Sequence, residues 1–323
     1  MPQALWLAVA ILAGCSGRQS ALAPAGEDAA QLKLLFIVML SGAAVLWLGL
    51  NGLFWYVTRH RPGAMPVARA NAVIVGGGVV LPTVLVGALL AWGLSIMPAQ
   101  RAPGEGLTLR VTAEEWWWRV EYWPEGATAP IVAANEIRLP TGTRTELRLN
   151  ANRFIHSFWV PALGGKMDMI PGRETVLTLR PDTPGGYRGQ CAEFCGPSHA
   201  LMAFEAVILA PGDFDAWLAA EARPARPPET PEEIRGAEVF RDEGCGACHA
   251  IRGTAHAGLV GPDLTHLGAR GSVGAGTLPM GAQALQDWIA HAGAIKPGVA
   301  MPSYDWIAAA DLSALATYLE SLK

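Results

Sequence analysis

The sequence predicts a multidomain protein with an N-terminal transmembrane helical hairpin, an all-β Greek-key sandwich and an all-α C-terminal domain. Three observations support this fold class. Two long apolar runs lie between Asp28 and Glu105, a stretch without acidic residues. Short stretches of alternating apolar and polar residues follow over 107–209. Residues 231–323 show apolar residues at helical spacing. Alternation is typical of strands, 3.6-residue spacing of helices, and long apolar runs of transmembrane helices.

The composition of the 323-residue chain differs from that of a typical soluble protein. Apolar residues make up 51% and charged residues 16%, which is more apolar and less charged than usual. The formal net charge of -4 and the lack of basic runs interleaved with aromatics give no indication of a nucleic-acid partner. Two close pairs and one single cysteine fit a disulfide framework poorly: Cys15, Cys191, Cys195, Cys245 and Cys248.

Residues 1–26 are predicted to contain a signal peptide and a short N-terminal segment. Residues 2–14 form an apolar run that is too short to span a bilayer and lacks the usual basic start. The run ends in Leu-Ala-Gly-Cys, which resembles a bacterial lipobox. This resemblance implies that Cys15 is lipidated and becomes the new N-terminus, the alternatives being an uncleaved anchor or a chance cysteine.

The predicted hairpin occupies residues 27–100. Its two runs, 32–57 and 71–97, would each be roughly 40 Å long as helices, enough to cross a hydrocarbon core of about 30 Å with tilt. The connection between them contains Arg59, Arg61 and Arg69 and no acid. The positive-inside rule places this loop in the cytoplasm. Everything after about residue 100 is then expected on the periplasmic or extracellular side.

Residues 101–222 are predicted to form the β-sandwich, with about seven short strands and a helical patch at 213–221. A Pro-rich, charged stretch at 223–230 predicts a semi-rigid, extended linker to the C-terminal domain at 231–323. In that domain we expect helices at 231–242, 282–292 and 311–323, with Asp311 as a cap-like residue. The clearest strand candidates are 107–112, 136–140, 145–150, 174–180 and 204–209.

Two thiols, an imidazole and a thioether fall within residues 191–202, CAEFCGPSHALM, and His156 lies upstream in FIHSFWVP. Soft sulfur ligands with imidazole favour copper. A single-copper site needs one cysteine, whereas two thiolates can bridge two coppers, each with its own terminal histidine. A zinc site or a Cys191–Cys195 disulfide is the alternative.

This loop resembles the CuA domain of cytochrome c oxidase subunit II, whose pattern C-x-E-x-C-x-x-x-H-x-x-M it matches throughout. The resemblance implies a cupredoxin-like sandwich that holds a binuclear copper site. It also implies a magnesium ion shared with subunit I through the Glu193 carboxylate. Trp116 of the Trp116-Trp117-Trp118 run becomes the candidate residue at which electrons enter, with core packing as the alternative. The implied copper ligands are Cys191 and Cys195 as bridges, His156 and His199, Met202, and the backbone carbonyl of Glu193.

Residues 245–249 read CGACH, the attachment motif of c-type haem. On a helical turn, positions i, i+3 and i+4 share a face, so Cys245 and Cys248 can join the haem while His249 reaches the iron. Zinc ribbons and redox motifs share this pattern. The helix before it, the GPDL at 261–264 and the final helix resemble class I cytochrome c.

The sixth ligand of the iron has several candidates. In the class I family it is a methionine shortly before the last helix, which implies Met301, in the sequence GVAMPSY. Met280 is the rival. Methionine–histidine ligation raises the reduction potential and suits an electron carrier. Three histidines are further candidates that we interpret as surface or structural residues: His256, His266 and His291.

In domain order, nearly the whole chain resembles subunit II of the caa-type cytochrome c oxidases. The resemblance implies the subunit through which electrons enter a haem–copper oxidase of the bacterial cytoplasmic membrane. Electrons would pass from a cytochrome c or a quinol:cytochrome c reductase to one covalent haem c, then to the copper pair. Oxygen would be reduced to water in subunit I. The present chain would then be a cytochrome-c oxidase subunit that does not contain the catalytic centre. Subunits I and III and membrane lipid are the other expected partners.

One departure from the family concerns proton uptake. The family often has a Glu just before the second membrane helix, whereas residues 69–81 contain no acid here. This favours considering two rivals to the oxidase: the CuA and haem c subunit of a haem–copper nitric-oxide reductase, and a membrane-tethered electron shuttle.

Overall fold

A computed structural model describes residues 16–60, 63 and 65–323 of the chain. The predicted lipobox, including Cys15, lies outside the described residues. The chain divides into two compact units, one formed by residues 30–102 and the other by residues up to 29 together with 103–323. The order of elements confirms the predicted fold class: two apolar helical segments, a β-sandwich, and a helical C-terminal domain.

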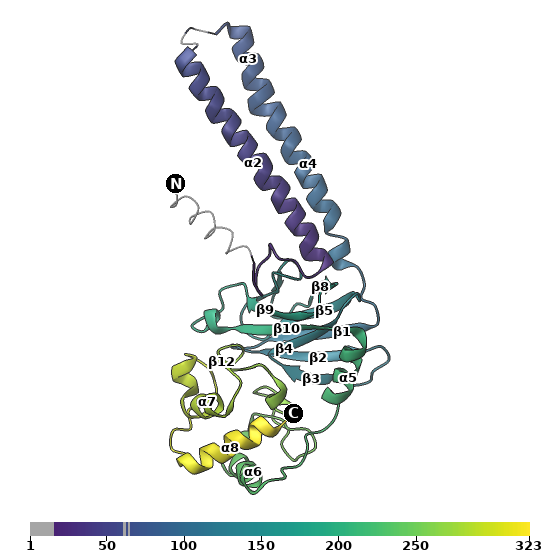
Figure 1. The fold of residues 1–323 in the computed structure, drawn as a ribbon, viewed down its shortest axis with the longest axis vertical. Helices are drawn as coiled ribbons and strands as arrows, with labels where there is room; N and C mark the ends of the chain where they lie inside the picture. The colour runs from purple at the N-terminus through teal and green to yellow at the C-terminus, as the bar shows by residue number, and fades with distance from the viewer. Residues whose placement is uncertain (1–15, 61–62, 64) are drawn as a thin grey trace, which may run out of the picture. The chain divides into compact units, whose positions relative to one another are not determined.

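The two apolar runs form long helical segments, coloured purple to blue in Figure 1. The first is one continuous helix, α2 (Glu27–His60). The second is α3 (Val67–Val75), a π-helical turn (Gly76–Val80) and α4 (Leu81–Ile96). Pro82 has no N–H to continue the regular ladder, which accounts for the wider turn beside it. Both segments are long and apolar enough to cross a membrane, and their apolar side chains are exposed.

The β-sandwich consists of two five-stranded sheets that enclose one hydrophobic core. The sheet orders are β3-β2-β1-β5-β8 and β4-β10-β9-β6-β7. The parallel pairs β1–β5 and β4–β10 require chain crossings of the Greek-key kind. The strands are β1 (Leu107–Ala113), β2 (Trp118–Pro124), β3 (Ile131–Ala134), β4 (Glu136–Pro140), β5 (Thr145–Ala151), β6 (His156–Trp159), β7 (Met167–Met169), β8 (Thr175–Leu179), β9 (Gly185–Cys191) and β10 (Ala203–Leu209).

The alternating stretches mark the strands correctly, because burial alternates residue by residue along β1 and along most of β5. The expected count of about seven strands was too low, since the described part of the sandwich has ten. β6 and β7 have only four and three residues, too few for alternation to appear. Of the Trp run, only Trp118 lies on a strand, at the start of β2.

The segment just before the first membrane helix packs into the sandwich. The Ala25 N–H donates to Ala162 O at 2.7 Å, and Ala25 O accepts from the N–H of Asp182 at 2.9 Å. The buried Asp28 forms an ion pair with the buried Arg144 at 3.2 Å. Residues on both sides of the hairpin therefore belong to one folded unit, as a hairpin with both ends on the same side of the membrane requires.

The rest of this unit is helical: α5 (Pro211–Glu221), α6 (Pro231–Asp242), α7 (Ala282–Ile295) and α8 (Ala309–Ser321). α6 packs closely on α8, because a Cβ on Gly236 would lie 2.1 Å from Ala314 O. The expectation for Asp311 was wrong. Ala308 is the N-cap of α8, and Asp311 lies in its first turn, where it pairs with Arg235 at 2.8 Å.

The segment at 223–230 is bonded to the helical domain. The Ala225 N–H donates to Arg252 O at 2.9 Å, and Arg226 pairs with Glu233 at 2.7 Å. Glu233 also completes a capping box with Thr230 at the start of α6. These bonds hold both ends of the Pro-rich stretch in place, so it is not free to act as a loose tether.

Candidate functional site

Strand pairing brings the first two predicted copper ligands together. β6 and β9 are antiparallel, and Phe158 lies opposite Cys191. His156 is two residues before Phe158 on β6, so its side chain projects from the same face of the sheet. His156 is fully buried and Cys191 is 4% exposed. The sandwich therefore fixes both side chains against the core.

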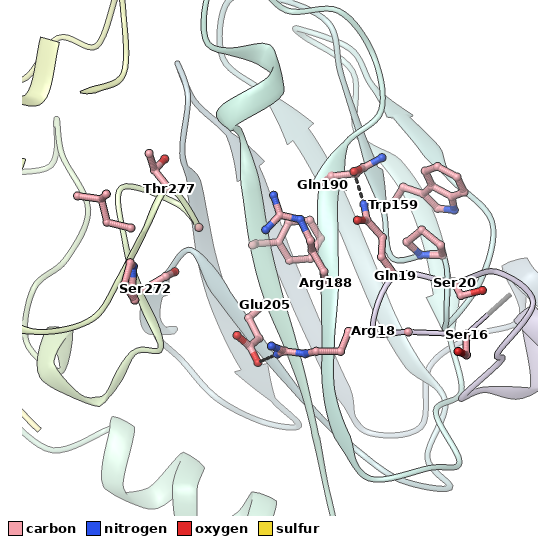
Figure 2. Close-up of a pocket in the computed structure, with 16 residues that line it drawn as sticks. Ser16, Arg18, Gln19, Ser20, Trp159, Arg188, Gln190, Glu205, Ser272 and Thr277 are labelled. Carbon is pink, nitrogen blue, oxygen red and sulfur yellow. Dashed lines mark hydrogen bonds and ion pairs between the residues drawn. The ribbon is translucent and has the colours of Figure 1, made fainter. Parts of the chain in front are cut away.

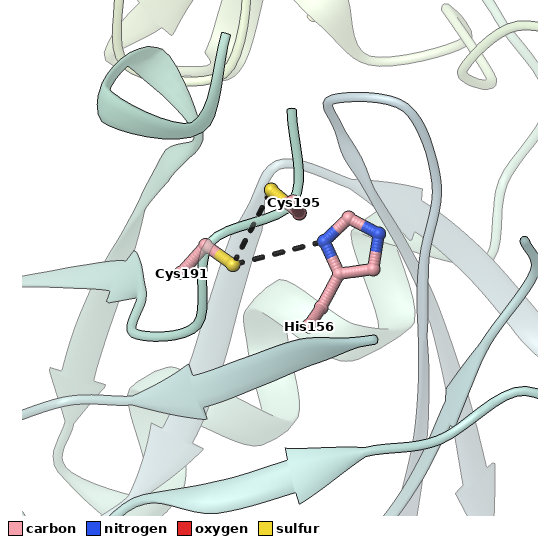
Figure 3. A group of neighbouring side chains, drawn as sticks. All are labelled: His156, Cys191 and Cys195. Atoms are coloured by element: carbon pink, nitrogen blue, oxygen red, sulfur yellow. Dashed lines mark hydrogen bonds between the residues drawn. The ribbon is translucent and has the colours of Figure 1, made fainter. Parts of the chain in front are cut away.

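The loop that follows β9 carries three more side chains of this cluster, those of Cys195, His199 and Met202. Figure 3 shows His156, Cys191 and Cys195 converging, with their ligand atoms within 4.8 Å of one another. The two sulfurs are 3.7 Å apart, and His156 Nδ1 is 3.7 Å from Cys191 Sγ. His199 Nδ1 and Met202 Sδ lie 3.6 Å and 4.0 Å from Cys195 Sγ.

Glu193 presents its backbone and its carboxylate in different directions. Its carbonyl oxygen is 3.2 Å from Cys191 Sγ, within the cluster. Its carboxylate is 45% exposed and lies 3.9 Å from Lys166 Nζ. The carbonyl is therefore available to the cluster and the carboxylate to the protein surface.

The electrostatics of the cluster favour a bound cation. A proton shared between the two sulfurs lowers the pKa of Cys191 and raises the pKa of Cys195, and burial further raises the pKa of Cys195. One thiol is therefore readily ionised, while a second negative charge beside it needs a positive partner. Two soft sulfurs, a thioether and two imidazole nitrogens suit copper in both character and number.

A second constellation lines a largely apolar cavity in the helical domain. Cys245, Cys248, His249 and Met301 all face it, and its volume is about 180 Å³. Cys245 and Cys248 flank a short 3-10 turn at Cys245–Ala247, which places the thiols on one side as the motif predicts. A planar, apolar group held by two thioethers would fit this lining.

His249 has the orientation and the protonation state of an iron ligand. Its Nδ1 lies 2.8 Å from Pro262 O, and such a bond leaves Nε2 free to bind a metal. Burial lowers the pKa of His249, which favours the neutral imidazole. Gly261 lies under the ring, where a Cβ would be 2.5 Å from His249 Cε1. This close approach explains why a glycine begins the GPDL sequence.

The candidates for the sixth ligand differ in position. Met301 lines the cavity, whereas Met280 is not among the lining residues. The three other histidines do not line it either. His256 packs against the Phe240 ring at 4.9 Å between centroids, and His266 Nε2 lies 3.1 Å from Arg223 O. His291 lies at the kink of α7.

Trp116 lies between the two constellations. It is 5% exposed, and its indole Nε1–H donates to Cys195 O at 2.9 Å. The same side chain lines the cavity of the helical domain. Gly298 permits the approach, because a Cβ there would lie 2.8 Å from the Trp116 ring. One indole therefore contacts the cysteine loop on one side and the cavity on the other.

Sequence reasoning missed Lys296, which is 1% exposed. Its Nζ donates to Leu201 O at 2.9 Å and to Gly274 O at 2.7 Å. Burial lowers the pKa of Lys296 to about 7. No sequence signal identified it, because a lone lysine is normally a surface residue.

A separate pocket of about 870 Å³ is lined by the N-terminal segment, β9, β10 and residues 272–279. Figure 2 shows Arg18 and Glu205 paired across it. Gln19 and Gln190 also bond to each other there. Among the predicted site residues that the structure describes, none lines this pocket.

Comparison with known proteins agrees with these two centres. Residues 123–208 match the family described as the periplasmic domain of cytochrome c oxidase subunit II. Residues 234–323 match the cytochrome c family. These matches imply CuA copper in the sandwich and haem c in the helical domain.

Curated proteins named cytochrome c oxidase subunit 2 are similar to most of this chain. Cytochrome c oxidase subunit 2 of Alkalihalophilus pseudofirmus is 33% identical over 327 residues, covering 97% of this chain and 94% of the relative. Subunit 2 of Bacillus subtilis is 31% identical, covering 76% and 70%, and that of Bacillus sp. strain PS3 is 32% identical, covering 75% and 69%. The chain belongs to the cytochrome c oxidase subunit 2 family, as a member with a cytochrome c domain at its C-terminus.

Proposed function

We propose that this chain receives electrons from a cytochrome c or a quinol:cytochrome c reductase and passes them to subunit I of a haem–copper oxidase. Electrons would reach the helical domain first, then the cysteine cluster of the sandwich, then subunit I, where oxygen is reduced to water. The chain would be a subunit of the enzyme without holding its catalytic centre.

The observation that carries this proposal is the position of Trp116. A buried indole that touches both the haem-type cavity and the backbone of Cys195 provides a through-protein connection between two redox sites. A shuttle that released its electrons elsewhere would need no such connection. We therefore assign Trp116 as the residue through which electrons enter the copper domain.

In the copper domain, six residues would hold the metal pair. When bound, the pair supplies one-electron redox chemistry with the charge spread over two metals. Cys191 and Cys195 would supply the two thiolates, and the sandwich would keep these sulfurs and both imidazoles in nearly fixed positions. The remaining ligands would be His156, His199, Met202 and the Glu193 carbonyl.

In the helical domain, Cys245 and Cys248 would attach one haem c covalently. His249 would be one axial ligand, oriented by its bond to Pro262 O. Met301 would be the other, since it lines the cavity.

The proposed function also predicts the location of the chain and its neighbouring subunits. The two apolar helices would lie in the bacterial cytoplasmic membrane beside subunits I and III. Both redox domains would lie on the periplasmic or extracellular side. The exposed Glu193 carboxylate would bind a magnesium ion shared with subunit I.

Purification of the intact complex through this subunit tests the proposal. We expect copper, haem c and a haem–copper subunit I to copurify, with oxygen consumption supported by reduced cytochrome c. Turnover of nitric oxide with b-type haems and non-haem iron would instead identify a nitric-oxide reductase. Copurification without any haem–copper subunit would identify a tethered shuttle.

Met301→Ala should abolish the methionine–iron charge-transfer absorption band of the oxidised haem and lower its reduction potential, because the thioether ligand is lost. The measurement is an absorption spectrum with a redox titration. Met280→Ala is the matched control and should keep the band. Loss of the band in the control but not in Met301→Ala would reverse the assignment.

Trp116→Phe should slow haem-to-copper electron transfer about tenfold or more, since small displacements in a reacting assembly carry large rate penalties. The smaller ring loses the bond to Cys195 O and part of its contact with the cavity. Rapid photoreduction of the haem, followed by its reoxidation, measures the rate. Trp123→Phe, on β2 and outside the cavity lining, should leave that rate unchanged. An unchanged rate in Trp116→Phe would remove this residue from the path.

A further inference from the structure

Lys296 joins the helical domain to the copper loop through its amino group. The side chain comes from the end of α7 and is 1% exposed. One of its hydrogen bonds goes to Leu201 O in the copper loop, at 2.9 Å. The other goes to Gly274 O in the helical domain, at 2.7 Å. A buried amino group with two carbonyl acceptors, one in each domain, has a defined position.

Two neighbouring hydrogen bonds extend the same contact. The Ser198 hydroxyl donates to Pro297 O at 2.6 Å, and the Ala203 N–H donates to Ala275 O at 3.1 Å. Ser198 is fully buried. The segment 198–203, which carries His199 and Met202, is therefore bonded to the helical domain at both of its ends.

The positions of these residues along the chain connect the contact to the two redox sites. Leu201 directly precedes Met202, a proposed copper ligand, and Lys296 lies five residues before Met301, a proposed iron ligand. Between them, Gly298 packs against Trp116. Residues 296–301 thus touch the copper loop at one end, the connecting indole in the middle and the cavity at the other end.

We propose that Lys296 is a positioning residue for electron transfer. It holds residues 296–301 and the copper loop in the relative position that keeps Trp116 in contact with both sites. This inference rests on the proposed function. The hydrogen bonds are the operative feature, because an amino group donates to both carbonyls whether it is protonated or neutral. A neutral side-chain donor should therefore replace it, even glutamine, whose side chain is one atom shorter.

The test uses the intact oxidase complex with three substitutions. Lys296→Met keeps the length and apolar stem but removes the donor. Lys296→Gln restores a donor without charge. Lys323→Met is the matched control, because Lys323 is the other lysine of the 231–323 domain and is exposed. Photoreduction of the haem followed by its reoxidation gives the haem-to-copper rate, and absorption spectra show whether both centres are loaded.

We expect Lys296→Met to slow the haem-to-copper rate roughly ten- to a hundredfold with both absorption spectra retained, as misplacement of a reacting group does. Lys296→Gln should stay within about threefold of wild type, and Lys323→Met should match wild type. A wild-type rate in Lys296→Met would overturn the proposal. Equal slowing in the Met and Gln variants would also overturn it and assign the effect to charge.

If Lys296→Met fails to load its centres, Lys296→Gln decides. A rate near that of wild type supports the donor role, and a tenfold loss contradicts it. Failure of the proposed function gives a different result, because the wild-type complex would then consume no oxygen with reduced cytochrome c, whatever its haem-to-copper rate.

Discussion

Replacing Cys195 with serine should remove the copper pair and stop cytochrome c-dependent oxygen consumption. Cys195 Sγ is the sulfur nearest to His199 and Met202 and lies 3.7 Å from Cys191 Sγ, so its loss separates both halves of the cluster. A hydroxyl is a poor substitute, because copper of this kind selects soft thiolate ligands. Replacing a residue that only hydrogen-bonds to a metal ligand lowers metal affinity or activity about 10- to 100-fold. Loss of a direct ligand should therefore lower copper affinity and turnover by more than about a hundredfold.

Copper analysis of the purified subunit and the turnover of the complex measure this outcome. Trp123→Phe is the control, since Trp123 lies on β2 and lines neither centre. The haem of Cys195→Ser should still be reduced by the donor, which separates a blocked path from an unfolded protein. Full copper content in Cys195→Ser would refute the assignment of the cluster.

Replacing both Cys245 and Cys248 with serine should abolish covalent haem and leave the copper domain intact. Serine hydroxyls do not form the thioethers that hold the haem, and the cavity alone would have to retain it. A haem stain of the denatured subunit measures covalent attachment. Oxygen consumption driven by cytochrome c should fall by more than about a hundredfold. Loss of the haem attachment is a larger change than loss of an indirect partner of a metal, which already costs about 10- to 100-fold in activity.

The copper content of this double variant is its internal control. It should equal that of wild type, because the copper ligands belong to the sandwich. Cys195→Ser should show the reciprocal pattern, with haem but no copper. A double variant that keeps covalent haem, or one that loses copper as well, would contradict the separation of the two sites.

The clustering of the proposed ligand residues could be predicted from the sequence, because most of them are close together in the chain. The positions 191–202 and 245–249 follow from loop or helical-turn geometry, so spacing alone brings most of the side chains together. His156 needed the resemblance, since only the pairing of β6 with β9 brings it to Cys191. The apolar helices were similarly clear, because a membrane span needs a long run and tolerates few charges.

Contacts between distant segments could not be predicted. Lys296 and Leu201 are far apart in sequence, and a lysine followed by proline and glycine is typical of a solvent-exposed turn. The Pro-rich stretch at 223–230 was expected to be a semi-rigid, extended linker, but which partners its backbone finds, such as Arg252 O, could not be read from the sequence. The cap of α8 depended on tertiary pairing too, because Asp311 binds Arg235 of α6 instead of its own backbone.

The packing of residues 25–28 into the sandwich has a consequence for biogenesis. Arg144 is buried, and its acidic partners Glu27 and Asp28 lie in the first turn of α2. If these two residues did not reach the sandwich, the guanidinium would be stranded in the core without its partner, at a cost of about 3–5 kcal/mol. The first turn of α2 is thus needed for the sandwich to mature with its full stability.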